Sequence, residues 1–258
     1  IPGDKSLSIR FIILSSLASG RSVAKNLLMS EDVKNAINCI KKLGIKINLK
    51  RDYCEVFGKG LWGYKYKKNL LLNSGNSGTT ARLISATIID SKKDIKITGD
   101  SSLKRRDMLR IIKPLEKIGA TFKKNNGKLP LIIRGSNKLK AIKYEEKLGS
   151  AQSKSAVMIA ALKTKGITKL KCSPSRNHTE LMFKNVLKIP IKTKKIKNYD
   201  FIEIEGLNNY KSFNYKIPGD ISSASFLIVL TLLLKDSYLT IKKVNINPTR
   251  IGIVKIFN

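Results

Sequence analysis

Four segments of the chain share one pattern of polar and apolar positions, in which a turn with glycine and a hydroxyl residue leads into an apolar run. The four turns contain Gly3, Gly75, Gly149 and Gly219, which follow one another after 72, 74 and 70 residues. Self-similarity at a long fixed period indicates one supersecondary unit used several times. A glycine-containing turn that opens a helix presents free backbone N–H groups and the positive end of the helix dipole, so these turns are suited to phosphates and carboxylates.

The residues after each of these helices repeat a second pattern. A short strand-like run comes first, and then a second helix begins near Asp32, Asp107, Thr179 or Thr249. The strand-like runs are VAKNLLM, DIKITGD, ITKLKCS and YLTIKKV. Two more strand-like segments follow in the first three units, so each unit predicts helix, strand, helix, strand, strand. The fourth unit reaches Asn258 before its two strands, and we therefore expect the natural protein to be longer.

Composition leaves room for real hydrophobic cores, because 258 residues with 42% hydrophobic content fit one large domain or two ordinary ones. The net charge of +33 is large enough to suggest a polyanionic partner such as nucleic acid or an anionic membrane. Lysine outnumbers arginine 41 to 10, however, and the lysines are scattered along the chain. Because arginine is the residue that clamps phosphates bidentately, this balance favours solvated lysine faces over a nucleic-acid surface.

The cysteines and the apolar runs exclude several classes of protein. Cys39, Cys54 and Cys172 have neither metal-ligand nor CxxC spacing, so they predict no zinc site and no disulfide framework. Their odd number fits a reducing cytosol, and we expect a cytoplasmic protein. The longest apolar runs fall short of the roughly 18 residues that a membrane-spanning helix needs, so no membrane partner is expected.

The first glycine motif, PGDKSLSIR, places three potential anion ligands around the entry of a helix. Lys5 is a point charge, Arg10 is a bidentate fork, and Ser6 with the N–H groups of the turn adds hydrogen bonds suited to a phosphate or carboxylate. The alternative is a serine-capped helix with two surface cations. The GxxxxGK[ST] pattern of a Walker loop is absent from the sequence.

Four further motifs place small, hydroxyl or cationic side chains at or near the start of helices. NSGNSGTTAR, GDSSLKRRDM, GSAQSKS and SRNHTE supply Gly75, Gly78, Thr79, Arg82, Lys104, Arg105, Arg106, Ser150, Gln152, Lys154, Arg176 and His178. Taken singly, each motif also fits a group of solvated cations. A single histidine such as His178 is more often a structural hydrogen-bonding residue than a catalyst.

Together, and in this order and spacing, the motifs PGDKSLSIR, NSGTTAR, GDSSLKRRDM, SAQSK, SRNHTE, PGDISSAS and NPTR resemble the 3-phosphoshikimate 1-carboxyvinyltransferase (EPSP synthase) family over essentially the whole chain. GDK, SAQxK, RxHxE and NxTR resemble its class II branch. The resemblance implies an α/β (α+β) fold of the enolpyruvyl transferase type, an inside-out barrel of repeated βαβαββ units in two domains. Six units of about 70 residues give about 420. Residues 5–217 are then expected to form the first domain, and residues 1–4 and 218–258 an incomplete second domain.

The resemblance also implies an activity. In this family the 5-hydroxyl of shikimate 3-phosphate adds to C2 of phosphoenolpyruvate and phosphate is eliminated, a step of the shikimate pathway to chorismate and aromatic amino acids. We therefore expect a transferase whose partners are these two small anions. No cofactor, metal or nucleic acid is implied, and the full-length protein is expected to be a monomer.

Site residues are carried over motif by motif from the family. Catalytic roles fall on Lys5, Arg106 and Gln152. The substrate-binding residues are Lys5, Ser6, Arg10, Gly78, Arg106, Ser150, Ala151, Gln152 and Arg176, with Gly78 and Arg106 facing phosphoenolpyruvate and Arg176 the shikimate carboxylate. Possible cleft-lining residues are Asn76, Arg82 and Asp220. The family's proton-transferring Asp and Glu are expected beyond Asn258, so the 258-residue chain is expected to bind substrate weakly and turn over negligibly.

Two departures and two rival interpretations remain. Asp107 stands where the family usually has Pro and places a carboxylate beside Arg106, while Ile9 stands where Asn or His is usual. The sister enzyme that acts on UDP-N-acetylglucosamine usually carries Asn after the first-motif lysine and a loop cysteine, whereas here Ser6 follows Lys5 and GDSSLKRRDM has no cysteine. A basic nucleic-acid-binding protein would leave the motif series unexplained, and 7% aromatic residues offer little stacking surface.

Overall fold

The computed structural model describes residues 1–257, apart from the side chains of residues 124 and 125. The helices are α1 (Lys5–Leu17), α2 (Glu31–Lys42), α3 (Gly78–Thr87), α4 (Ser101–Arg105), α5 (Leu109–Ile118), α6 (Ala151–Ala161), α7 (His178–Leu181), the π-helical turn η1 (Met182–Val186), α8 (Ile221–Leu233) and α9 (Gly252–Phe257). The strands are β1 (Ser19–Lys25), β2 (Lys46–Leu49), β3 (Tyr53–Lys59), β4 (Leu70–Asn73), β5 (Ile95–Thr98), β6 (Thr121–Asn125), β7 (Lys128–Arg134), β8 (Lys143–Glu146), β9 (Ile167–Cys172), β10 (Ile191–Ile196), β11 (Tyr199–Glu205) and β12 (Asn214–Lys216).

The strands form three four-stranded sheets with one shared topology, in the orders β12-β1-β3-β2, β4-β5-β7-β6 and β8-β9-β11-β10. In each sheet the first pair is parallel and the other two pairs are antiparallel. The βαβαββ unit therefore occurs three times in a mixed α/β fold. The first strand of the first unit is β12, which comes from the far end of the three units and pairs Val23 with Asn214. Within residues 1–257 the sheets remain separate, and no hydrogen-bonded barrel closes.

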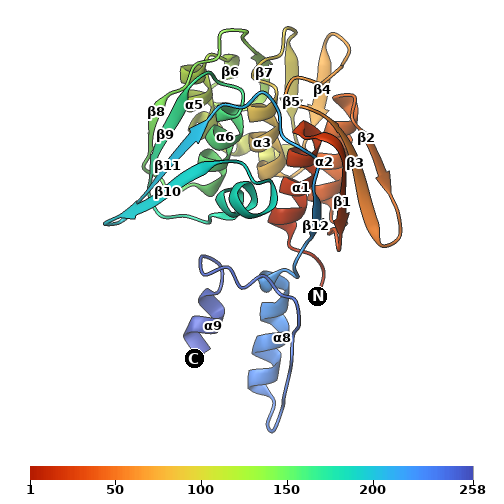
Figure 1. The fold of residues 1–258 in the computed structure, drawn as a ribbon. Coiled ribbons are helices and arrows are strands. Elements are labelled where there is room, and N and C mark those ends of the chain that lie inside the picture. The colour runs from red at the N-terminus through yellow and green to blue at the C-terminus, as the bar shows by residue number, and fades with distance from the viewer. Residues whose placement is uncertain (258) are drawn as a thin grey trace.

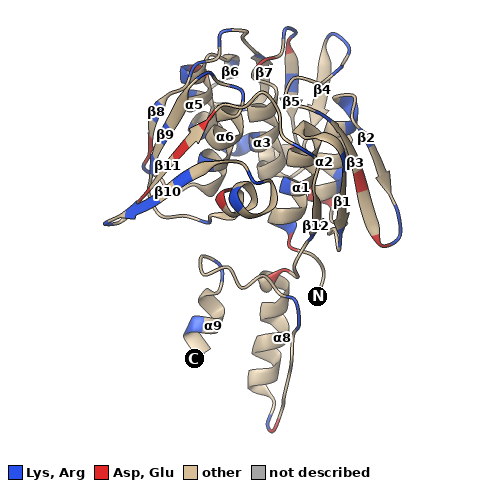
Figure 2. Cartoon of the chain, viewed as in Figure 1, with Lys and Arg blue, Asp and Glu red and all other residues tan. Residues whose placement is uncertain are grey.

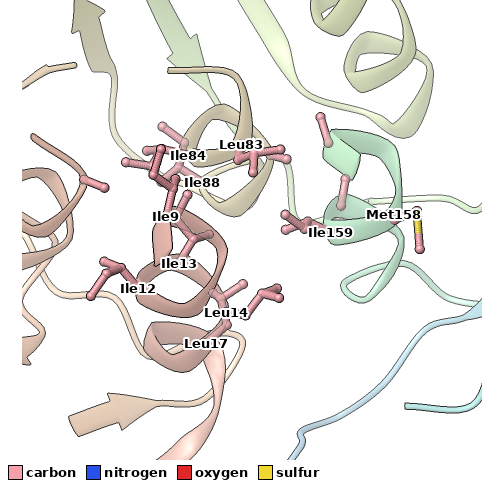
Figure 3. Packing of buried hydrophobic residues seen from close by; sticks show 14 of the residues in the cluster. Ile9, Ile12, Ile13, Leu14, Leu17, Leu83, Ile84, Ile88, Met158 and Ile159 are labelled. Carbon is pink, nitrogen blue, oxygen red and sulfur yellow. The ribbon is translucent and has the colours of Figure 1, made fainter. Parts of the chain in front are cut away.

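The helices that follow the first three glycine turns, α1, α3 and α6, form the centre of the body (Figure 1). Every residue of α1 from Leu7 to Leu17 is buried, and α6 is buried almost throughout. Figure 3 shows side chains of α1, α3 and α6 packed together, among them Ile13, Leu83 and Ile159. A helix enclosed on all sides needs no polar face, which explains why these segments have apolar runs instead of an amphipathic pattern.

The turns before these helices, and before α8, provide N-caps. The side chains of Asp4, Ser77, Ser150 and Asp220 cap α1, α3, α6 and α8, and each accepts a hydrogen bond from a backbone N–H of the first turn. Each cap satisfies one of the free N–H groups that a helix start leaves. The other backbone N–H groups of the first turn have no acceptor within the helix and can face a ligand.

Two equivalent Pro-Gly-Asp turns bind each other where the body meets residues 218–257, which lie below it in Figure 1. The N–H of Asp4 donates to the carbonyl of Pro218 at 2.8 Å, and the N–H of Asp220 donates to the carbonyl of Pro2 at 2.9 Å. Gly3 leaves no room for a side chain, because a Cβ there would overlap the carbonyl oxygen of Asn26. The reciprocal bonds place the starts of α1 and α8 side by side.

The fourth unit departs from the sequence prediction. YLTIKKV (238–244) forms no strand and contributes only an isolated bridge between Gly219 and Val244. The predicted strand is wrong in this structure because a strand needs a hydrogen-bonding neighbour, and none lies beside most of this segment within residues 1–257. The second helix, α9, begins at Gly252 instead of near Thr249. None of the helices among the described residues has the length and apolarity to cross a bilayer.

Candidate functional site

A cavity of about 660 Å³ opens beside the first turn of α6. Its walls include Ser150, Ala151 and Gln152 from that turn, together with the two cations Arg110 and Arg176. No Asp or Glu lines this cavity among the described residues. A helix N-terminus with two guanidinium groups and no carboxylate is an environment that favours a small anion.

The turn that precedes α6 is held by hydrogen bonds to the carboxylate of Glu146. Glu146, which is buried, accepts hydrogen bonds from the N–H groups of Leu148 at 3.1 Å and Ser150 at 3.0 Å. Gly149 within the turn has a φ of +61°, a left-handed conformation that favours glycine. Ser150 then accepts from the N–H of Ser153 at 3.2 Å. The first turn of α6 is therefore fixed in place before a ligand arrives.

Arg82 connects the starts of α3 and α6. It is buried, its Nη1 donates to Oε1 of Gln152, and its Nη2 donates to the carbonyl of Asp107 at 2.9 Å. Gln152 in turn donates from Nε2 to Oγ1 of Thr79 at 2.8 Å. Burial, with the added positive charges of Arg110 and Arg106, lowers the pKa of Arg82 to about 10. Arg82, predicted only to line a cleft, thus orients Gln152 at the cavity wall.

Arg106 lies over the start of α3. Its Nη2 donates to Oδ1 of Asn76 at 2.9 Å, and Asn76 donates to Oδ2 of Asp100 at 2.8 Å. Gly78 is the residue that lets the guanidinium groups approach, since a Cβ there would lie 2.9 Å from Nη1 of Arg82 and 3.5 Å from Nη1 of Arg106. The structure brings Asn76, Gly78, Arg82 and Arg106 together at the start of α3, while their predicted contacts with substrate stay predictions.

Asp107 does not turn its carboxylate to Arg106. Its Oδ1 accepts from the N–H of Leu109 at 2.9 Å, and its Oδ2 lies 3.5 Å from Nε of Arg110. Within the described residues no hydrogen bond or ion pair joins Asp107 to Arg106. The carboxylate that the sequence placed beside Arg106 is balanced by Arg110.

Lys5 lies at the start of α1, beside the clasped Pro-Gly-Asp turns. Its half-exposed ammonium group lies 3.1 Å from Oδ2 of Asp32, and its backbone N–H donates to Oδ2 of Asp220 at 3.2 Å. Arg250 donates from Nη2 to Oγ of Ser222 at 2.6 Å and lies 3.3 Å from Oδ1 of Asp220. Asp220 therefore joins the start of α1 to the segment around Arg250.

Arg10 is buried in α1, and its hydrogen bonds join this helix to α6 and α7. Its Nε donates to Oγ1 of Thr179 at 2.8 Å, its Nη2 to Oγ of Ser155 at 3.0 Å, and its Nη1 to the carbonyl of Ser6 at 3.1 Å. Burial is the main cause that lowers its pKa to about 10. Its predicted contact with substrate stays a prediction, while its structural role is visible.

His178 is a buried structural residue in this arrangement. Its Nε2 lies 3.4 Å from Nδ2 of Asn245, which also donates to Oδ2 of Asp4 at 3.0 Å. Burial, with the positive charges of Arg10, Arg250 and other cations nearby, lowers the pKa of His178 to about 3. The ring is therefore neutral near pH 7, in agreement with the structural interpretation of this histidine.

This shift predicts that the fold loses stability in mild acid. Below about pH 6.5 the unfolded chain takes up a proton on His178 that the folded chain refuses, so the free energy of unfolding falls by up to about 1.4 kcal/mol per pH unit. His178→Asn removes this contribution. Urea unfolding at pH 7.5, 6.0 and 5.0 should show a shallower loss for the variant; equal slopes for both proteins would contradict the prediction.

The cysteines offer no reactive thiol among the described residues. Cys39, Cys54 and Cys172 are free and buried, and burial raises the pKa of each to about 12. A thiol with that pKa is a poor acid at neutral pH. Within residues 1–257 no cluster of His, Cys, Asp and Glu has an arrangement that could hold a metal ion.

Two residues of the site were missed in the sequence. Arg110 follows Asp107 by one helical turn in RRDMLR, and this spacing was the available signal. Arg250 lies in the NPTR motif, which was recognised without a role for the arginine. Lys154, by contrast, was a candidate anion ligand in GSAQSKS, but its side chain is fully buried and its Nζ lies 2.6 Å from Oε1 of Glu180.

Comparison with known proteins gives one consistent match. The family model EPSP synthase (3-phosphoshikimate 1-carboxyvinyltransferase) matches residues 1–258. A 3-phosphoshikimate 1-carboxyvinyltransferase of Thermoanaerobacter sp. (strain X514) is 42% identical over 259 residues, covering 99% of this chain and 59% of the relative. One from Ruthia magnifica subsp. Calyptogena magnifica is 42% identical over 258 residues, covering 99% and 58%.

The solved structures agree with the sequence relatives. An EPSP synthase from Acinetobacter baumannii superposes with a TM-score of 0.89 at 34% sequence identity, covering 99% of this chain and 57% of that one. The present chain thus spans less than two thirds of the length of the curated relatives it matches, 59% for the Thermoanaerobacter protein.

Proposed function

The chain belongs to the EPSP synthase family, and we propose that it binds shikimate 3-phosphate as part of a 3-phosphoshikimate 1-carboxyvinyltransferase. That enzyme transfers the enolpyruvyl group of phosphoenolpyruvate to the 5-hydroxyl of shikimate 3-phosphate and releases phosphate. The observation that carries the proposal is the 660 Å³ cavity, which combines the first turn of α6 with two arginines and no carboxylate. Its chemistry fits a ligand with a phosphate and a carboxylate.

Shikimate 3-phosphate is proposed to place its phosphate at the first turn of α6, against Ser150, Ala151 and Gln152. Arg176 is then available for the ring carboxylate, because its guanidinium donates no hydrogen bond to the part of the chain that the structure describes. Lys5 and Ser6 at the start of α1 do not line this cavity and are proposed to contact the same ligand from the neighbouring helix start. Preorganised N–H groups and cations of this kind bind the anion without the cost of reorganising at the moment of reaction.

Phosphoenolpyruvate is proposed to bind where Gly78, Arg106, Gln152 and Lys5 lie, at the starts of α3 and α1. Arg106 is oriented by Asn76, and Gln152 by Arg82 and Thr79. The cations would stabilise charge on the phosphate that leaves. We assign no proton transfer to the described carboxylates near the site, because Asp32, Asp107 and Asp220 each already pair with a cation.

The same proposal includes the domain organisation and the setting of the reaction. Residues 5–217 would form one domain, residues 1–4 and 218–258 would belong to a second, and the substrates would bind between them in the cytoplasm. No nucleic-acid or membrane partner is proposed. Figure 2 supports this, since lysine and arginine are scattered over strands, helices and loops and do not collect on one element.

The test is a calorimetric titration of shikimate 3-phosphate into the 258-residue chain, beside Lys5→Ala. We expect saturable binding that is about 10-fold weaker in the variant, since a hydrogen-bonded charge contact contributes about 1.5–3 kcal/mol. The Lys5 side chain is half-exposed and its partner Asp32 is at the surface of the fold, so the variant should stay folded.

Lys68→Ala is the matched control, because this exposed lysine precedes β4 and its loss changes the net charge equally. It should bind like the parent chain. Titrations at two salt concentrations separate a specific site from general attraction to a +33 chain. Absence of binding, together with tight and salt-sensitive binding of RNA, would instead favour a nucleic-acid-binding protein.

A further inference from the structure

Arg110 is an arginine of the cavity that no motif assigned to a ligand. It lines the cavity together with Arg176 and the start of α6, and its side chain is 34% exposed. Its buried Nε makes no hydrogen bond within residues 1–257, and the carboxylate of Asp107 lies 3.5 Å from it. Its backbone is nevertheless fixed, because Ser153 donates from Oγ to the carbonyl of Arg110 at 2.8 Å.

Apart from Arg176, which is reserved for the carboxylate in the proposed function, the neighbouring arginines Arg82 and Arg10 are engaged by the protein. Arg82 donates to Gln152 and Asp107, and Arg10 donates to two hydroxyls and a carbonyl. An arginine has five N–H donors in a planar fork that matches the oxygens of phosphate. Arg110 therefore offers a guanidinium with no hydrogen bond within residues 1–257 and only a loose ion pair with Asp107, beside the N–H groups of a helix start. Arginine and a helix start are the usual combination for holding a phosphate.

Within the described part of the chain, Asp107 is the carboxylate that pairs with this guanidinium. Its Oδ2 lies 3.5 Å from Nε of Arg110, and both side chains are partly exposed, at 45% and 34%. A partly exposed pair at this distance contributes little, about 0–1 kcal/mol. It is weak enough for a phosphate to displace, yet the carboxylate competes for the same guanidinium.

We propose that Arg110 binds the phosphate of the ligand in this cavity, and that Asp107 sets the affinity by competing with the phosphate for Arg110. The inference rests on the proposed function in taking shikimate 3-phosphate as the ligand. The phosphate then lies between the first turn of α6 and Arg110, which leaves Arg176 for the carboxylate. Arrival of a dianion also offsets the repulsion that Arg106 and Arg110 exert on Arg82.

The experiment measures the affinity of the 258-residue chain for shikimate 3-phosphate, shikimate and inorganic phosphate by calorimetry. Arg110→Gln should weaken binding of shikimate 3-phosphate about 10-fold and leave shikimate unchanged. Asp107→Asn should tighten shikimate 3-phosphate about 3-fold. In the double variant the gain from Asp107→Asn should vanish, because the fork for which Asp107 competes is gone.

Arg51→Gln is the control for net charge, since Arg51 is exposed in the turn between β2 and β3. The inference is overturned if Arg110→Gln leaves shikimate 3-phosphate unchanged, if it weakens shikimate equally, or if Asp107→Asn gives the same gain without Arg110. Its failure is distinguishable from failure of the proposed function. A chain that binds inorganic phosphate through Arg110 but does not prefer shikimate 3-phosphate refutes the proposed substrate and keeps the phosphate contact; a chain that binds neither refutes both.

Discussion

Lys154→Met is expected to lower the free energy of unfolding by about 3–5 kcal/mol. The Lys154 side chain is fully buried in α6, with Nζ 2.6 Å from Oε1 of Glu180 and 3.9 Å from Oδ2 of Asp200. Methionine fills a similar space but leaves the Glu180 carboxylate buried without its cation. Oε2 of Glu180 already has no hydrogen-bond donor among the described residues, so little remains to stabilise the charge. Urea unfolding followed by far-UV circular dichroism measures the loss.

The controls separate the charge from the packing. Lys154→Met combined with Glu180→Leu should recover most of the stability, because replacing both partners of a buried pair with apolar residues is often neutral. Lys184→Met changes an exposed lysine on η1 and should stay within about 0.5 kcal/mol of the parent. A single variant as stable as the parent, or a double variant as unstable as the single one, would contradict the account.

The repeat could be predicted from the sequence because its signal is local. A glycine turn, a capping residue and a long apolar run lie within about one helix length, and the spacing repeats at Gly3, Gly75 and Gly149. The caps, the buried central helices and the paired strands after them all follow from such neighbours. The family motifs added the βαβαββ order, which the three sheets confirm.

Strand pairing between distant segments could not be predicted from the pattern of polar and apolar positions. The short strand β12 gives no signal of its own, and it forms because β1 offers an edge to it after the chain has passed through all three units. YLTIKKV has the composition of a strand but lacks the neighbour that would make it one. In both cases pairing decides the outcome, and pairing depends on residues far away in the sequence.

At the candidate site, too, the sequence indicates which residue types are present but not which partners surround them in the fold. Sequence motifs selected Lys5, Arg106 and Gln152 as candidates, but could not show which cations would have protein partners. Lys154 is fully buried against Glu180, whereas Arg110 is partly exposed and has only a loose ion pair with Asp107. This difference depends on the tertiary environment of each side chain, and it decides which cations can meet a ligand.

Arg82→Met is expected to weaken binding of shikimate 3-phosphate about 100-fold, because the charge-assisted hydrogen bond that orients Gln152 is lost, a contribution of about 1.5–3 kcal/mol. The variant leaves Oε1 of Gln152 and the carbonyl of Asp107 without the donors they have in the parent chain. Gln152 can then turn away from the cavity wall, and the positive potential of the site falls. Calorimetric titration measures the affinity, and circular dichroism shows that the variant remains folded.

Arg82→Lys distinguishes orientation from charge. Lysine keeps the positive charge, but one ammonium group cannot reproduce the fork that reaches both acceptors, so about a 10-fold loss is expected. Arg134→Met is the matched control, because Arg134 pairs with Asp94 through Nε at 2.6 Å on an exposed part of β7 and should not affect the ligand. If Arg82→Met is folded and binds within about 2-fold of the parent, Gln152 does not depend on Arg82, and the first turn of α6 alone holds the anion.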